Sequence, residues 1–296
     1  MEVKITFRKA KKADIPHLID LMNAYYKRKK TEQYFFWQYF NSVYPAVLII
    51  ALADKKVIGI FGLQKRKLTN SAALGQAIDL LVSSEWRGKG IFKRLAEKAL
   101  NYFSGIDAFC VFPNLQGKIA CEKGLGWKTL GKINSLFLRN KIKETVEVIK
   151  SYKPKQELIK FKYNSGIRKW RFEQNPVYKY SKVKINSGKF AIVKIFKDSQ
   201  AKKCYGDVVD FGCNINDGLT LRKLFLEANL YLRKKGAKVI TTRALPDTHL
   251  HKIVKSLGFI EVPQERFFCL KVLNPKYQNL YNFSKWHLVQ ADAEIY

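Results

Sequence analysis

Apolar and polar residues alternate along the first half of the chain with two different spacings. Apolar runs and period-two alternation predict strands, whereas apolar residues that recur every three or four positions predict helices. The predicted strands span residues 3–8, 46–53, 57–63, 76–82, 108–112 and 133–139. The predicted helices begin at Asp14 or span residues 31–40, 90–103 and 119–123. The resulting order is β-α-α-β-β-β-α-β-α-β, which favours a mixed sheet flanked by helices.

The second half repeats the later part of this order. Strand patterns cover residues 190–196, 207–211, 237–241 and 267–272, and helical patterns cover residues 217–235 and 248–257. The pattern weakens and the charge rises between Lys141 and Ser151, which indicates a boundary there. We expect an α/β (α+β) protein with two domains, residues 1–145 and 146–296. They are predicted to be two versions of one fold, although no clean sequence repeat is visible.

The segment that follows the strand at 76–82 carries the clearest chemical signal. It reads SSEWRGKGIFKRLAEKAL, so Arg87, Gly88, Lys89 and Gly90 join a strand directly to an amphipathic helix. Glycines let the backbone turn sharply and approach an anion without a Cβ in the way. The N–H groups and dipole of the helix, together with the two cations, attract that anion. The pattern favours a phosphate-binding loop over a plain glycine turn with ordinary surface charge.

This loop and the order of elements around it resemble the GNAT superfamily of acyl-CoA-dependent N-acetyltransferases over roughly residues 3–140. The family pattern is Gln/Arg-x-x-Gly-x-Gly/Ala between the fourth strand and the third helix. Residues 87–92, Arg-Gly-Lys-Gly-Ile-Phe, match it through Gly90 and depart from it at Phe92. The resemblance implies acetyl-CoA, or another acyl-CoA, as cofactor, with its pyrophosphate on this loop.

The resemblance also implies which residues hold the rest of the cofactor. The main chain of the fourth strand would pair with the pantetheine arm. That arm would enter between the fourth and fifth strands, which splay apart in the family. A weaker match in PNLQGKIACEKGLGW adds an Asn after the fifth strand and Gly126-Trp127. The implied cofactor residues are Leu81, Val82, Arg87, Gly88, Lys89, Gly90, Ile91, Phe92 and Asn114.

Asp79 is the preferred candidate for the catalytic base, because acids on this strand border the acceptor site in the family. An amine acceptor must lose a proton as it attacks a thioester, and a carboxylate can take that proton directly or through water. Pairing with a nearby Lys is the structural alternative for Asp79. Glu85 is the second candidate. Many members carry a Tyr as general acid where this chain has Cys121 and Glu122, so no general acid is assigned.

The C-terminal half resembles a degenerate GNAT domain that shapes the acceptor site. VVDFG, VITT and KSLGF match the late segments of the fold, but CNINDGLT stands where the phosphate loop would be. The segment at 167–180, IRKWRFEQNPVYKY, resembles a stretch in bacterial acetyltransferases linked to surface-polysaccharide synthesis. Its aromatic residues could stack on an acceptor or form interdomain core, and core is favoured.

Composition limits the other functional classes. The chain has 55 Lys and Arg against 24 Asp and Glu, a formal net charge of +31, which attracts anions, although scattered lysines also fit a solvated surface. Five cysteines without a C-x-x-C pair and four histidines give no metal-site spacing. The N-terminal residues alternate apolar with charged positions, unlike a secretion signal, and no apolar run is long enough to span a bilayer. We therefore expect a cytoplasmic protein.

These observations favour an enzyme, an acyl-CoA-dependent N-acetyltransferase. Its expected acceptor is a small amine, such as an amino sugar or a nucleotide-linked sugar, reached by direct transfer in a ternary complex. One alternative is an aminoacyl-tRNA-dependent peptidoglycan transferase, a class that also pairs two such domains but generally lacks the pyrophosphate loop. Another alternative is a non-catalytic basic module for nucleic acid or an acidic membrane surface, which rests on the net charge alone.

Overall fold

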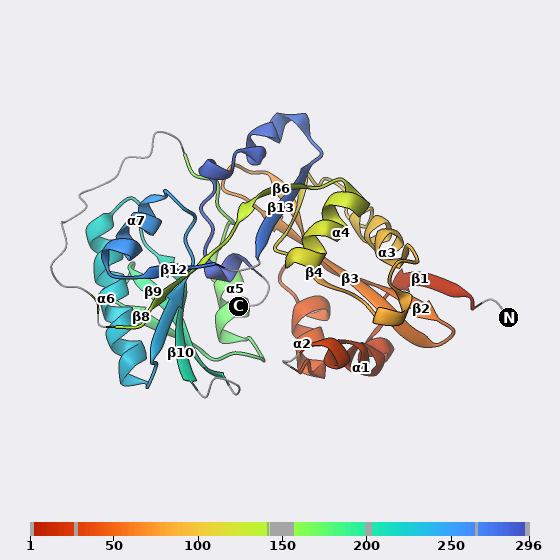
Figure 1. The fold of residues 1–296 in the computed structure, drawn as a ribbon, viewed down its shortest axis with the longest axis horizontal. Helices are drawn as coiled ribbons and strands as arrows, with labels where there is room; N and C mark the ends of the chain where they lie inside the picture. The colour runs from red at the N-terminus through yellow and green to blue at the C-terminus, as the bar shows by residue number, and fades with distance from the viewer. Residues whose placement is uncertain are drawn as a thin grey trace. The chain divides into compact units, whose positions relative to one another are not determined.

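The computed structural model of the chain describes residues 3–26, 29–140, 142, 157–198, 203–263 and 266–293. The chain forms two compact units, and each unit combines separate stretches of sequence. Unit 1 comprises residues 1–131, 162–177 and 267–281, and unit 2 comprises residues 132–161, 178–266 and 282–296. Each unit is built around one sheet, which confirms the predicted α/β class (Figure 1). Most of the predicted boundary, residues 141–151, lies outside the described residues.

The sheet of unit 1 has seven strands in the order β1-β2-β3-β4-β5-β13-β6. Its strands are β1 (Ile5–Lys9), β2 (Ala46–Ala53), β3 (Lys56–Lys67), β4 (Ala73–Val82), β5 (Ala108–Val111), β6 (Lys128–Lys132) and β13 (Phe267–Val272). Its helices are α1 (Ile15–Tyr25), α2 (Glu32–Phe35) with the π-helical turn η2 (Phe36–Phe40), α3 (Ile91–Leu100), α4 (Leu115–Leu125), and α5 (Ser165–Arg168) with the π-helical turn η4 (Lys169–Glu173).

Helices cover both faces of this sheet, which is why β2 is apolar at nearly every position. Val47, Ile49 and Ala51 point to the core cluster that contains α3 and α4. Leu48 and Ile50 point to the second cluster, which contains α1 and α2. In the ribbon, α1 and α2 lie on the opposite side of the sheet from α3 and α4 (Figure 1). Alternate residues of a strand face opposite sides, so the unbroken apolar run supplies two cores at once.

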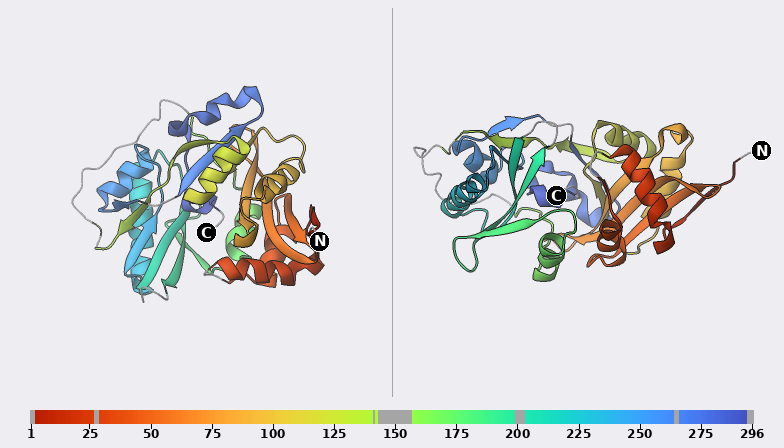
Figure 2. Two further views of the ribbon diagram at one scale, coloured as in Figure 1. Left: turned by 45° about the vertical axis from the view of Figure 1, so that its right-hand side comes forward. Right: turned by 90° about the horizontal axis from the view of Figure 1, so that it is seen from below.

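The sheet of unit 2 has six strands in the order β12-β7-β11-β10-β9-β8. The strands are β7 (Ser135–Leu138), β8 (Tyr180–Lys184), β9 (Phe190–Asp198), β10 (Lys203–Gly212), β11 (Val239–Thr242) and β12 (Ile260–Val262). The helices α6 (Gly218–Lys234) and α7 (His249–Ser256) pack together beside this sheet (Figure 2). Strand, long helix, strand, short helix is the order that the sequence predicts for this half.

Each sheet contains one strand that is far in sequence from the strands beside it. β7 follows β6 along the chain but lies between β11 and β12, while β13 lies between β5 and β6. β4 and β10 occupy matching places, because Gly75 pairs with Phe109 of β5 and Gly206 pairs with Ile240 of β11. Aligned on these glycines, β4 reads GQAIDL and β10 reads GDVVDF. Strand pairing therefore reveals a short internal repeat that the sequence alone did not show.

Several predicted elements differ from the observed ones. The helix predicted at 119–123 is α4, which runs through Gly124 and ends where Gly126 adopts the left-handed conformation with φ 66°. The predictions miss β6, β8 and β12, which are three to five residues long. None of the residues in these strands is buried, so their sequences lack the apolar signal of a core strand.

Candidate functional site

The loop between β4 and α3 has the backbone geometry that its glycines predicted. After the 3-10 turn η3 (Ser84–Trp86), Gly88 and Gly90 adopt φ of 76° and 73°, which L side chains rarely accept. Apart from the adjacent residues of the chain, no atom lies within 4 Å of the position that a Cβ would take at either glycine. Gly90 is the N-cap of α3, so the first N–H groups of that helix, which have no partner inside the helix, open onto the loop.

The loop's side chains are anchored beside aromatic rings. Arg87 Nε donates to the carbonyl of Val82 at 3.1 Å, and its guanidinium lies 5.7 Å from the centre of the Tyr25 ring. Lys89 Nζ lies 4.7 Å from the centre of the Trp86 ring. Both cations are exposed. Two positive charges therefore lie at the N-terminus of α3, where they add to the field of the helix dipole.

Phe92, which departs from the family pattern, does not obstruct the loop. Its ring packs against Phe61 at 5.8 Å between centroids, in the core cluster between α3 and the sheet. Ile91 is buried in the same cluster. The aromatic side chain is thus directed into the core, and only the backbone of Phe92 belongs to the first turn of α3.

The carboxyl-terminal half of β4 extends past its parallel neighbour. Within the described residues, β4 pairs with β5 only over residues 74–77, whereas it pairs with β3 as far as Val82. Leu80, Leu81 and Val82 are partly exposed. This edge of β4, residues 78–82, directly precedes the loop, and we call it the unpaired edge. It is the place where the sequence led us to expect splayed strands.

Asp79 lies at an irregularity in β4. The register between β3 and β4 shifts between Ile60 and Gly62, and Asp79 has a φ of 48°. A β-bulge adds a residue and redirects the side chain, and a positive φ at a non-glycine residue is a strained arrangement that clusters at functional sites. The bulge places the Asp79 carboxylate in the core on the α1 and α2 side of the sheet.

The Asp79 carboxylate contacts the side chains of Tyr34, Tyr39 and Lys30. Tyr34 Oη and Tyr39 Oη donate hydrogen bonds to its Oδ2 at 2.6 and 2.8 Å. Lys30 Nζ lies 3.4 Å from Oδ1. The Asp79 side chain is only 2% exposed. A buried carboxylate is tolerated when such donors replace its water, so this cluster both stabilises and orients the negative charge.

A π-helical turn brings the two tyrosines together. Tyr34 lies on α2, and Tyr39, five residues later, lies on the π-helical turn η2 that continues it, where Asn41 N–H donates to Phe36 C=O. A five-residue turn places side chains five positions apart on one side, and such turns are frequent at functional sites. The prediction of an ordinary helix at 31–40 gave no reason to group these residues. Their five-residue spacing is the only sequence signal that points to them.

Gly62 makes room for this arrangement. A Cβ at Gly62 would overlap Tyr39 Oη and would lie 2.8 Å from the carbonyl of Ile78. Gly62 also pairs with Ile78 in the sheet. The glycine is therefore required on β3 so that the Tyr39 hydroxyl can reach Asp79.

The remaining predicted residues lie elsewhere in unit 1. Glu85 is exposed in η3, two residues before Arg87. Asn114 is the N-cap of α4, where its Oδ1 accepts from Gly117 N at 2.9 Å. Cys121 on α4 is fully buried, and burial raises the pKa of its thiol to about 12. That thiol is therefore protonated and inert at neutral pH.

The equivalent helix of unit 2 has a different N-terminus. Asp217 caps α6, and its carboxylate accepts from the N–H and the hydroxyl of Thr220 at 3.0 and 2.5 Å. Lys189 Nζ lies 3.4 Å from the same carboxylate. A negative side chain thus occupies the anion position of α6, whereas Gly90 leaves that of α3 open.

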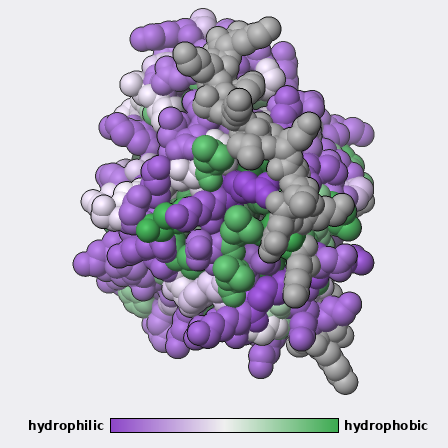
Figure 3. All heavy atoms as spheres, turned by 90° about the vertical axis from the view of Figure 1, so that its left-hand side faces the viewer, coloured by the Kyte–Doolittle hydropathy of each residue, from purple (hydrophilic) through white to green (hydrophobic). Residues whose placement is uncertain are grey.

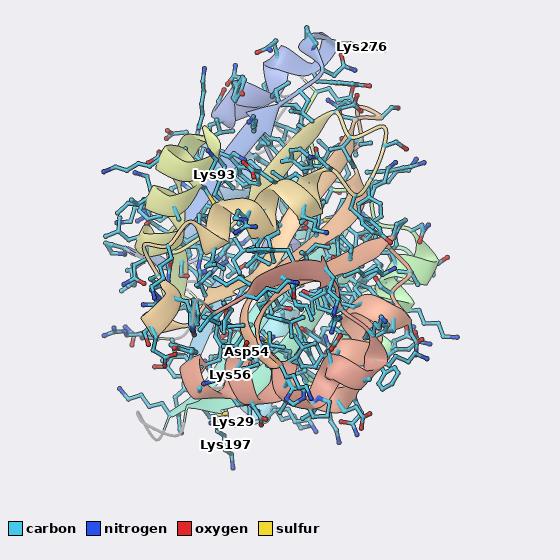
Figure 4. The ribbon with its side chains drawn as sticks, turned by 90° about the vertical axis from the view of Figure 1, so that its right-hand side faces the viewer. Lys29, Asp54, Lys56, Lys93, Lys197 and Lys276 are labelled. Atoms are coloured by element: carbon cyan, nitrogen blue, oxygen red, sulfur yellow. The ribbon has the colours of Figure 1, made fainter. Side chains whose placement is uncertain are left out.

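Charge is spread over many elements rather than concentrated on one. Lys56 beside the β2–β3 turn, Lys93 on α3, Lys197 on β9 and Lys276 after β13 are all exposed (Figure 4). The face of the molecule in Figure 3 is mostly hydrophilic, with several hydrophobic side chains near its centre. No helix of the described part of the chain is both long and apolar enough to cross a bilayer. The same residues contain no group of three or more His, Cys, Asp or Glu side chains able to hold a metal ion.

The similarity to solved structures covers residues of both units. The chain is similar to a GCN5-related N-acetyltransferase from Anabaena variabilis, with a TM-score of 0.65, 11% identity, and coverage of 92% of this chain and 73% of that one. It is also similar to a conserved protein of unknown function from Enterococcus faecalis, a probable N-acyltransferase, with a TM-score of 0.62, 9% identity, and coverage of 96% and 75%. Because these matches span nearly the whole chain, the predicted double arrangement is confirmed at the level of the fold.

A third similar structure is the GCN5-related glucosamine N-acetyltransferase region of a fungal multi-domain GH3 β-N-acetylglucosaminidase. Its TM-score is 0.57 at 13% identity; the match covers 91% of this chain, which spans 38% of the fungal protein. A comparison with curated proteins found no match. The family model described as the acetyltransferase (GNAT) family matches residues 15–126, which include the loop, the unpaired edge and the Asp79 cluster. Residues 15–126 are therefore similar to the acetyltransferase (GNAT) family.

Proposed function

We propose that this protein is an acyl-CoA-dependent N-acetyltransferase that acts on a small amine by direct transfer within a ternary complex. The observation that carries the proposal is the continuity of two features, the open N-terminus of α3 and the unpaired edge of β4. The first is a site for a pyrophosphate, and the second offers backbone groups to an extended arm that follows it. An acyl-CoA has these two parts in this order.

The cofactor residues have distinct roles in this proposal. The N–H groups of residues 88–92 bind the pyrophosphate, and Arg87 and Lys89 add charge-assisted contacts. The main chain of Leu81 and Val82 pairs with the pantetheine arm. Asn114 positions the start of α4, since its side chain already caps that helix.

The transfer itself needs a proton acceptor and an oriented amine. The amine nitrogen attacks the thioester carbonyl, the bond between carbon and sulfur breaks, and CoA leaves as a thiolate that takes up a proton. We propose that Asp79 receives the amine's proton, directly or through water, because it is the buried carboxylate at the end of the unpaired edge. Glu85 is the alternative base. Because its side chain is exposed beside the loop, its other proposed role is to orient CoA.

We further propose that unit 2 shapes the acceptor site and binds no acyl-CoA. The Asp217 carboxylate at the N-terminus of α6 repels a pyrophosphate where α3 attracts one. An amino sugar, free or nucleotide-linked, is the acceptor that we propose. A glucosamine N-acetyltransferase region with the same fold motivates this choice.

Thermal stabilisation by acetyl-CoA tests the proposal. Gly90→Glu places a carboxylate in the loop, so we expect the wild type to be stabilised by acetyl-CoA and this variant not to be. Gly236→Glu is the matched control, because Gly236 is also exposed and left-handed, with φ 92° and nothing within 4 Å of its Cβ position. Stabilisation should persist in the control. If neither acetyl-CoA nor longer acyl-CoAs stabilise the wild type, the proposed function is wrong.

A further inference from the structure

Lys30 lies in an environment suited to a bound ammonium group. Its Nζ is 3.4 Å from Asp79 Oδ1 and 3.5 Å from the centre of the Tyr34 ring. The Tyr26 ring centre is 6.0 Å away. A carboxylate together with an aromatic face is the combination with which proteins bind primary ammonium groups. The Lys30 side chain is 19% exposed, so its amine is partly removed from water.

This amine lies beside the unpaired edge of β4. Asp79 belongs to that edge, and Tyr26 Oη lies 3.5 Å from the carbonyl of Leu80 on the same edge. Strand residues advance about 3.3 Å each, so Asp79 lies roughly 10 Å back along β4 from Val82, where the loop begins. An acyl-CoA bound on the loop with its arm along this edge brings its thioester toward Asp79 and Lys30. This step rests on the proposed function.

We propose that Lys30 is an intramolecular acceptor: its Nζ occupies the acceptor's position and is acylated by the acyl-CoA bound to the same chain. Lys30 first loses a proton to Asp79. The neutral Nζ attacks the thioester carbonyl, an amide bond forms, and the bond from carbonyl carbon to sulfur breaks. The second proton of the nitrogen passes to the leaving CoA thiolate, which departs as the thiol, and Asp79 returns the first proton to solvent. The products are N-acetyl-lysine at position 30 and one free CoA.

The modification changes the charge at the site. An acetylated Lys30 has no positive charge, so the ion pair with Asp79 and the contact with the Tyr34 ring are lost. The carboxylate keeps both tyrosine hydroxyls as donors. Self-acetylation therefore removes the positive charge that pairs with Asp79, and each chain releases one CoA before any acceptor is added.

The competing role for Lys30 is purely structural. A buried carboxylate is costly without a cation nearby, and Lys30 supplies one whether or not an acyl group is ever transferred. A structural lysine and an intramolecular acceptor differ in one observable, the rate of acetylation of Nζ. Lys29 provides the matched control, because it is exposed, adjacent in sequence, and donates only to the carbonyl of Asn23 among the hydrogen bonds described for it.

The experiment incubates the full chain with acetyl-CoA in the absence of any amine and follows Lys29 and Lys30 by peptide mass spectrometry. We expect Lys30 to gain one acetyl group at a rate per chain that does not depend on protein concentration, and Lys29 to react at the slow rate of free lysine. Asp79→Asn should slow Lys30 acetylation about 10²-fold or more, the range of a general base. Gly90→Glu should abolish it, and Lys30→Arg should remove the signal while keeping the positive charge.

The outcomes separate this inference from the function on which it rests. If acetyl-CoA stabilises the protein but Lys30 reacts no faster than Lys29, the inference is overturned and the proposed function stands. If acetyl-CoA fails to stabilise the protein, the proposed function fails first. A Lys30 rate that rises in proportion to protein concentration would show transfer between chains and would also overturn the intramolecular step.

Discussion

The indole rings of Trp37 and Trp170 stack at 4.4 Å between centroids, and each ring N–H donates to the main-chain carbonyl of the other residue, at 2.9 and 3.2 Å. Both tryptophans lie on π-helical turns, η2 and η4. Trp170 is 2% exposed. Trp170 therefore belongs to the core of unit 1, which confirms the preference for core over acceptor stacking at this residue. The predicted interdomain place is wrong for it, because the segment 162–177 lies within unit 1.

Removing this contact should destabilise unit 1. We expect Trp170→Ala to lower the free energy of unfolding by about 3–5 kcal/mol, as for other buried aromatic truncations. Val177→Ala, at a residue that is 40% exposed in the same segment, is the control and should change it by less than about 0.5 kcal/mol. Urea unfolding followed by far-ultraviolet circular dichroism, which does not rely on tryptophan fluorescence, measures the free energy of unfolding of both variants. Equal stability of the two variants would contradict the packing described for Trp170.

Gly62 should be intolerant of a side chain. Gly62→Ala forces Tyr39 Oη away from Asp79 or shifts the strand, at a cost of about 1–3 kcal/mol typical of overpacking. Gly188→Ala is the control, because nothing lies within 4 Å of the Cβ position there. The transition midpoint should fall for the first variant alone. A tolerated alanine at Gly62 would show that Tyr39 does not need to approach β3.

The two candidate bases should differ in kinetics. If Asp79 accepts the proton, Asp79→Asn should lower kcat/KM about 10²–10⁴-fold while acetyl-CoA still stabilises the variant. Glu85→Gln should leave kcat within a few-fold, since its exposed side chain is beside the loop. Steady-state assays of CoA release measure both. A larger loss of kcat/KM in Glu85→Gln than in Asp79→Asn would indicate that Glu85, and not Asp79, is the base.

Each chain should bind one acyl-CoA. The α3 N-terminus is open, whereas the Asp217 carboxylate with Thr220 and Lys189 fills the N-terminus of α6. Isothermal titration with CoA should give a stoichiometry of one, and Gly90→Glu should reduce it to zero. A second site that survives in Gly90→Glu would contradict the role given to unit 2.

His287 should make the protein less stable in mild acid. Burial, with a contribution from the positive charge of Lys160, lowers the pKa of His287 to about 3. An unfolded histidine has a pKa of about 6.5, so between these values the unfolded chain binds a proton that the folded chain does not. Stability from this group is complete above pH 6.5 and is lost as the pH falls.

The size of that loss can be measured with His287→Phe. The change removes the titration and keeps an aromatic ring against Phe211, whose ring centroid lies 5.9 Å from that of His287. Between pH 7 and pH 5 the wild type should lose about 2 kcal/mol more unfolding free energy than the variant. Parallel losses in the two proteins would mean that folding does not lower the pKa of His287.

Local sequence was enough to identify the phosphate loop. Gly88 and Gly90 between a strand and a helix have a conformational requirement that does not depend on the rest of the fold, and both adopt positive φ. β2 and β4 were predicted for the same reason, since their apolar runs are short-range signals. The Asp79 cluster was not predictable in this way. Lys30, Tyr34 and Asp79 come together through sheet register, a bulge and a π-helical turn, which depend on contacts between distant segments.

By itself the sequence determined that the chain has a strand, a Gly-x-Gly loop and an amphipathic helix able to bind a phosphate, and that this order of elements occurs twice in part. Only the tertiary structure decided that β7 and β13 are exchanged between the two sheets and that the segment 162–177 belongs to unit 1. The reason is physical. Apolar periodicity indicates which face of a strand is buried, but many strands have the same pattern. Which strands pair therefore depends on the total burial and hydrogen bonding of the whole chain.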